Sequence, residues 1–278
     1  MENKKKSLIL FLEKNFRQVG HLFTIAMRYL ITFLISISAV AFSYAQDDLA
    51  LYEPTKADYD YWEYRRKMTV PPYGLDKVKG LIKKIEIKSD DNDDMGLSAL
   101  STADFKSLTL REKFTYTVVH PELYSQNCDI RIMLPNEEQK VFGYLLSTLN
   151  EQTWSQRQLV FLRENRDSVM SYIEESTLRS KRMGVNYKDV IDEINGWEMI
   201  PFIITYFESN KKDKDALTLL LLLMKKGEYE EFLKSTSYRK LYGQSYNYET
   251  YIEYNKANEA LILQRAMGYF KEKSAGGK

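Results

Sequence analysis

Cysteine and histidine are scarce in this chain of 278 residues. Cys128 is its single cysteine, so no disulfide can form within the chain and stability must come from packing. His21 and His120 are its two histidines, whereas the common zinc sites draw several ligands from histidine and cysteine. We therefore expect neither a metal nor a cofactor, and histidine-based catalysis in the body of the chain would depend on His120 alone.

The signatures of well-known catalytic and binding loops are also missing. The sequence holds no glycine-rich phosphate loop, Walker motif, serine elbow or H-E-x-x-H zinc motif. The acidic segment 89–96 departs from the calcium-binding EF-hand pattern, because Met95 stands where glycine is required and Ser101 where a bidentate glutamate is required. We interpret this segment as a solvated, charged loop.

A basic face that could bind nucleic acid is absent from the sequence pattern. Residues 46–278 hold slightly more acidic than basic residues, and no long stripe of lysine and arginine interrupts that balance. Binding to nucleic acid depends on neutralising phosphates with lysine and arginine. We therefore exclude nucleic acid as a partner.

The longest apolar run is too short for a membrane span and has the pattern of an export signal. A spanning helix needs about 20 apolar residues, and Leu30 to Tyr44 is shorter and diluted by serines. Arg28 precedes the run, and Ser43-Tyr44-Ala45 supplies the small residues that a signal peptidase reads. The pattern resembles bacterial signal peptides as a class, and it predicts cleavage after Ala45 and a periplasmic or secreted body.

Two features of this leader leave alternatives open. Residues 1–26 make it long, so the true start is either Met1 or Met27. Residues 29–46 could also be retained as an uncleaved anchor, which would then be the only membrane contact. The basic residues precede the apolar run, so the positive-inside rule places the body outside the cytoplasm in either case.

Hydrophobic periodicity predicts a mainly α fold, an irregular helical bundle or stacked helical hairpins. We expect the chain to have four parts. They are a leader with a signal peptide over 1–45, an N-terminal segment rich in aromatic and acidic residues over 46–106, a helical domain over 107–273 and a disordered tail over 274–278. Alternating residues predict one small β-hairpin near 82–88 and 129–134. The expected helices start at a Thr109–Glu112 capping box, at Pro135, at Ser155 (running to about Lys181), near Tyr187, and at about Glu249 (running to Lys273).

The segment Leu217–Met224, LTLLLLLM, is apolar almost all round and predicts a helix buried among neighbours. Gly227 then predicts a C-terminal cap. Gly227, Tyr229 and Phe232 resemble the middle of a tetratricopeptide repeat, which implies stacked hairpins. No second copy follows at the 34-residue period, so we predict an irregular array.

His120 and Cys128 are the candidate reactive pair, with Glu122 and Asp129 near them in sequence. A thiolate, an imidazole and an orienting carboxylate are the parts of a cysteine hydrolase. The competing interpretation gives them structural roles: a buried thiol, and an imidazole bonded to the backbone.

Tyrosines are concentrated near the C-terminus, and Tyr242, Tyr246, Tyr248 and Tyr251 form a candidate recognition surface. Tyrosine combines an apolar face with a polar tip, which suits interfaces and sugar platforms. The alternative is a packing seam between the last two helices.

These observations predict an exported cell-envelope protein with a non-catalytic binding or structural role, its partner an envelope protein or a glycan. The alternative is a cell-envelope hydrolase acting on peptidoglycan or glycan, with a carboxylate pair on its helices. Six glutamates are candidates and the sequence selects no pair among them: Glu151, Glu164, Glu174, Glu175, Glu198 and Glu208.

Overall fold

The computed structural model describes residues 52–86, 88–89, 95–125, 133–243 and 250–276. Pro54–Lys278 forms one compact unit, distinct from Met1–Glu53. The leader and the cleavage site after Ala45 lie outside the described residues. Among the helices that are described, none combines the length and the apolar character that crossing a membrane would require.

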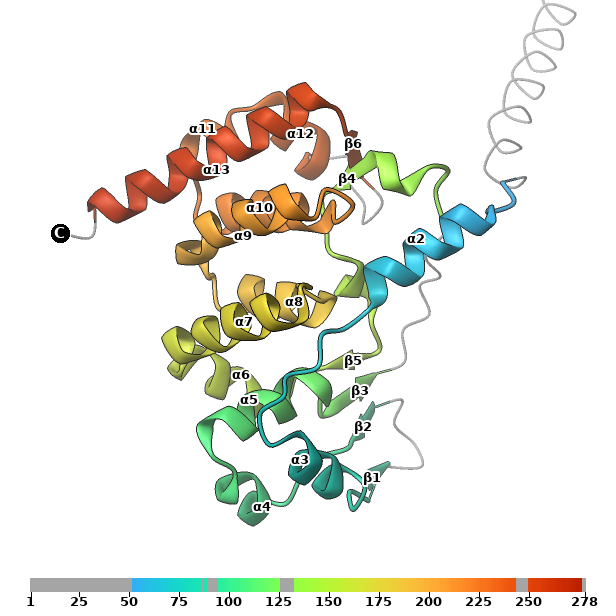
Figure 1. The fold of residues 1–278 in the computed structure, drawn as a ribbon, viewed down its shortest axis with the longest axis vertical. Coiled ribbons are helices and arrows are strands. Elements are labelled where there is room, and N and C mark those ends of the chain that lie inside the picture. The colour runs from blue at the N-terminus through green and yellow to red at the C-terminus, as the bar shows by residue number, and fades with distance from the viewer. Residues whose placement is uncertain (1–51, 87, 90–94, 126–132, 244–249, 277–278) are drawn as a thin grey trace, which may run out of the picture. The chain divides into compact units, whose positions relative to one another are not determined.

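The prediction of a mainly α fold is confirmed, and the elements of residues 54–106 pack in the same unit as the helices that follow. Figure 1 shows α3, α4 and α5 at one end of this unit and α11, α12 and α13 at the other. The described helices are α2 (Lys56–Arg66), α3 (Leu75–Ile82), α4 (Thr102–Ser107), α5 (Leu110–Val119), α6 (Gln156–Glu164), α7 (Arg166–Ser180), α8 (Val185–Glu193), α9 (Ile200–Ser209), α10 (Asp215–Lys226), α11 (Glu230–Leu233), α12 (Thr236–Tyr242) and α13 (Lys256–Gly276), with 3₁₀ turns η1 (Glu137–Gln139), η2 (Leu146–Leu149) and η3 (Trp197–Met199).

Two small antiparallel sheets accompany the helices. One has the order β1 (Lys88–Ser89), β2 (Met95–Leu97), β3 (Leu123–Ser125), β5 (Gln152–Thr153), and the other pairs β4 (Lys140–Phe142) with β6 (Tyr251–Glu253). The strand expected near 82–88 is wrong over residues 82–86, where α3 ends at Ile82 and a turn follows. Of the described residues in that range only Lys88 belongs to a strand, β1, and it pairs with β2, opposite Leu97. Residues 129–132 of the other expected strand lie outside the described part of the chain.

Local capping signals are confirmed where the sequence carries them. The Thr109 hydroxyl accepts from the backbone N–H of Glu112 and the Glu112 side chain accepts in return, which is the capping box that starts α5. Ser155 and Gln158 do the same for α6. The helix expected from Ser155 to Lys181 is interrupted at Asn165, whose side-chain amide donates to the carbonyl of Phe161 (2.8 Å) and competes with the helical hydrogen bonds.

The prediction of a helix that starts at Pro135 is wrong. Asn136 has a left-handed backbone (φ 54°), and the chain then forms η1 and β4. Val141 of β4 lies opposite Ile252 of β6. The same pairing delays the last helix, which begins at Lys256 instead of Glu249 and continues to Gly276, so residues 274–276 of the expected tail are helical.

The buried apolar helix was predicted correctly. In α10 the side chains of Leu217, Leu219, Leu220 and Leu223 have no exposed surface. The helix lies against α8, α9, α13 and β4, so apolar residues are needed on every side of it. Gly227 caps its C-terminus, as expected.

A buried ion-pair cluster ties the N-terminal helix to this core. The Arg65 guanidinium of α2 donates from Nη2 and Nε to Asp215 at the start of α10 (2.9 and 3.0 Å) and from Nη1 to Glu137 of η1 (2.8 Å). The side chains of all three residues are at most 3% exposed. Burial alone would lower the pKa of Arg65, but the Asp215 and Glu137 carboxylates raise it above its ordinary value.

Replacing Asp215→Ala should lower the free energy of unfolding by about 3–5 kcal/mol, because it leaves a buried guanidinium short of its main counter-ion. Urea unfolding followed by circular dichroism measures the change. The control is Lys56→Ala, which breaks the exposed Lys56–Asp60 pair of the same helix and should leave stability nearly unchanged. Equal effects of the two substitutions would contradict the assigned role of Arg65.

Candidate functional site

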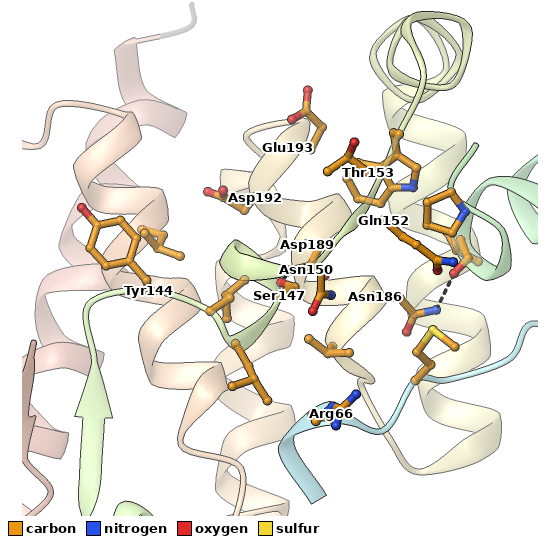
Figure 2. Close-up of a pocket in the computed structure, with 18 of the residues that line it drawn as sticks. Arg66, Tyr144, Ser147, Asn150, Gln152, Thr153, Asn186, Asp189, Asp192 and Glu193 are labelled. Carbon is orange, nitrogen blue, oxygen red and sulfur yellow. Dashed lines mark hydrogen bonds between the residues drawn. The ribbon is translucent and has the colours of Figure 1, made fainter. Parts of the chain in front are cut away.

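A cavity of about 840 Å³ opens between five parts of the compact unit. Its walls come from the end of α2, the end of α5, the segment 144–154, α8, and the last turn of α10 with the residues that follow it. Figure 2 shows Ser147 and Asp189 together near its centre, Tyr144 to one side and Arg66 at an edge. Its volume lies within the range of small-molecule sites, about 300–1,000 Å³.

Helix α8 supplies an acidic face to this cavity. Asp189, Asp192 and Glu193 stand at positions i, i+3 and i+4 and all three line the cavity. Residues at this spacing share one side of a helix. The opposite side of α8 is apolar, with Val190 and Ile191 fully buried, so packing of that side orients the carboxylates.

Asp189 is the most strongly perturbed group of the cavity. Its pKa is raised to about 7. Burial away from water is the main cause, the charge of Asp192 acts in the same direction, and the hydrogen bond from Ser147 acts in the opposite one. The Ser147 hydroxyl of η2 donates a hydrogen bond to Oδ1 of Asp189. Near neutral pH this carboxyl group is therefore divided between its protonated and ionised forms.

The two other carboxylates of α8 have basic partners. The Lys226 ammonium of α10 lies 3.0 Å from Oδ1 of Asp192. Arg163 of α6 lies 2.6 Å from Oε1 of Glu193. Their charges are thus compensated within the protein, whereas no described basic residue forms an ion pair with Asp189.

Lys225 is the basic counterpart of Asp189 in this cavity. Its Nζ lies over two aromatic rings, 4.3 Å from the centre of Tyr242 and 5.1 Å from that of Tyr144. Within the described part of the chain, no carboxylate oxygen comes within ion-pair distance of it. Burial lowers its pKa, and the charge of Asp192 acts in the opposite sense.

The remaining polar wall is fixed by internal hydrogen bonds. The amide of Asn186 donates to the carbonyls of Thr69 (2.9 Å) and Val118 (3.0 Å) and accepts from the N–H of Thr69 (3.0 Å). The Trp154 indole donates to the carbonyl of Thr117 (2.9 Å). These two side chains shape the cavity and have little capacity left to bind a ligand.

Of the predicted reactive pair, His120 can be placed and Cys128 lies outside the described residues. The Nε2 atom of His120 is 2.7 Å from the carbonyl oxygen of Ser98. This contact is the one expected if the imidazole has a structural role and bonds the backbone. The neighbouring Glu122 is buried and accepts from Tyr116 Oη (2.6 Å), Arg157 Nε (2.9 Å) and the Ser155 hydroxyl. This carboxylate is saturated by structural partners, so it does not orient an imidazole.

The structure describes two of the four tyrosines of the predicted recognition surface. Tyr242 is buried, and its hydroxyl donates to the carbonyl of Gly143 (2.8 Å), which places it in a packing seam. Tyr251 is half-buried in β6, against Phe142. Tyr246 and Tyr248 lie outside the described residues.

Sequence reasoning missed the three residues that matter most in the cavity: Ser147, Asp189 and Lys225. The D-x-x-D-E spacing of α8 was a readable sign of one acidic helix face. Nothing local connects that face to Lys225, which comes from another helix.

No group of three or more histidine, cysteine, aspartate or glutamate side chains is arranged to hold a metal ion within the residues that the structure describes. Comparisons with models of protein families, with curated proteins and with solved structures find no match to this chain. The function is therefore argued from the geometry of the cavity.

The raised pKa of Asp189 predicts a pH-dependent stability. Folding moves this pKa from an ordinary 3.8 to about 7, so the folded state holds an extra proton between these values. Its contribution to stability should be complete below about pH 4 and lost as the pH rises through 7, by at most about 1.4 kcal/mol per pH unit.

Urea unfolding between pH 4.5 and 8 should show this slope in the natural chain and not in Asp189→Asn. The stability difference between the two proteins isolates Asp189 from other titrating groups. Parallel curves over this range would contradict the assignment.

Proposed function

We propose that this chain is an exported, non-catalytic binding protein of the cell envelope, and that its cavity holds a small polar ligand derived from an envelope polymer. The proposal of export rests on the pattern of residues 27–48, and the proposal of binding rests on the cavity. The observation that carries it is a cavity of about 840 Å³ in which Asp189 and Lys225 are both present without an ion-pair partner among the described residues.

The construction of the walls supports binding. Asn186 and Trp154 are held by hydrogen bonds to the backbone, so the cavity is formed before a ligand arrives. A preformed site spares the ligand the cost of ordering it. The aromatic ring of Tyr144 and the exposed side chains of Gln152 and Thr153 line the same space, which suits a ligand with both apolar and hydrogen-bonding groups.

The second candidate function is a hydrolase of the same polymers. One observation favours it: the pKa of Asp189 is raised to about 7, so a fraction of this carboxyl group is protonated near neutral pH, and Asp192 stands one turn away on the same helix. A protonated carboxyl group beside an ionised one is the combination that general acid–base hydrolysis of glycans uses.

Calorimetry with the full chain and muramidase-released soluble fragments of bacterial cell walls tests the binding proposal. Asn150→Trp places a large ring at a residue that lines the cavity, and should weaken binding by about tenfold or more, which is ~1.4 kcal/mol. The matched control is Glu151→Trp, because Glu151 is also exposed but does not line the cavity.

Absence of binding, or equal binding by the two variants, would overturn the proposal. Chromatography of the same fragments after incubation separates the two candidate functions. A binding protein leaves them unchanged, whereas a hydrolase shortens them and loses that activity in Asp189→Asn.

A further inference from the structure

The cavity contains two charges of opposite sign that the described part of the protein does not neutralise. We infer that its ligand is zwitterionic, a free amino acid or a short peptide, whose ammonium group binds at Asp189 and whose carboxylate binds at Lys225. This inference rests on the proposed function, since it names the ligand class of the same cavity.

Asp189 has one oxygen available for such an ammonium group. Ser147 donates to Oδ1, and the described residues donate no hydrogen bond to Oδ2. Oδ2 is not among the buried polar atoms that lack a hydrogen-bond partner, so it keeps some contact with solvent. A bound ammonium group would donate to Oδ2 and favour the ionised form of the carboxyl group.

Lys225 is held in place, but none of the described carboxylates serves as its counter-ion. The rings of Tyr242 and Tyr144 attract its ammonium group by cation–π interaction and hold it at the cavity wall. Tyr242 is itself fixed by its hydrogen bond to Gly143, so the position of the cation is determined by the core. A ligand carboxylate would supply the charge-assisted hydrogen bond that no described carboxylate supplies.

The other charged groups around the cavity are less suited to these roles. Asp192 faces Lys226, and Glu193 faces Arg163. Arg66, at the opposite edge, stacks on Trp62 (4.2 Å) and has the Glu63 carboxylate at 4.0 Å. A neutral sugar would leave both Asp189 and Lys225 without a partner of opposite charge, so the charge pattern favours a zwitterion.

The test uses the full chain and the alanine series from the single amino acid to tetra-alanine, measured by calorimetry at pH 7.5. The length that binds best is then compared with its N-acetylated and its C-amidated form. Each blocked form should bind about tenfold more weakly or worse, because each loses one charge-assisted contact.

Two variants assign the contacts separately. Asp189→Asn should bind the free and the N-acetylated peptide with similar affinity, while it still discriminates against the amide. Lys225→Met should show the reverse pattern. Asp167→Asn and Lys234→Met, on exposed positions away from the cavity, are the controls and should keep the natural preferences.

Equal binding of the free and the blocked peptides would overturn the inference. Binding of cell-wall fragments without binding of any alanine peptide would also overturn it and leave the proposed function standing. Failure of both ligand sets would remove both proposals. Melting curves of each variant, compared with the natural chain, show whether a lost affinity reflects lost folding.

Discussion

The guanidinium group of Arg65 is almost completely buried, so carboxylates from distant parts of the chain must together supply its counter-ions. A buried charge without partners costs several kcal/mol. Asp215 and Glu137 satisfy it with three contacts of 2.8–3.0 Å, and they belong to the start of α10 and to η1. By pairing with Arg65 they fix α2 against the beginning of the most buried helix and against the segment that leads to Ser147. Arg66 and Met68, which follow Arg65 closely in the chain, line the cavity.

A second buried pair places α8 in the same way. Lys188 donates to Asp213 (2.8 Å), which also accepts from the hydroxyl of Tyr206 (2.8 Å). Lys188 and Asp189 are neighbours in sequence, so the pairing of Lys188 inside the core directs Asp189 to the cavity. The charge of Lys188, which Asp213 neutralises in the core, and the charge of Asp189, for which the described residues supply no ion-pair partner, thus stand next to each other on one turn of helix. An electrostatic requirement of the core thereby determines the geometry of the cavity.

The sequence predicted those elements whose signals are local. The Thr109–Glu112 capping box and the apolar run Leu217–Met224 each lie within one helix, so their patterns were sufficient. Residues 135–149 were assigned wrongly because the partner of Val141 is Ile252, far along the chain, and helical spacing of apolar residues does not reveal such pairing. The cavity was beyond prediction for the same reason, since Asp189 and Lys225 are brought to one space only by the packing of α8 against α10.

The separation of Arg65 from Asp215, 150 positions along the chain, has a consequence for the time course of synthesis. At about 5–20 residues per second, the carboxylate leaves the ribosome roughly 8 to 30 seconds after the guanidinium. Glu137 follows Arg65 by 72 positions, so only one of the two carboxylate partners is present before Asp215 is made. Burying Arg65 with that partner alone would leave it short of its main counter-ion. The buried ion-pair cluster is therefore complete only once the start of α10 has been made, and a chain that ends before α10 lacks the main counter-ion of Arg65.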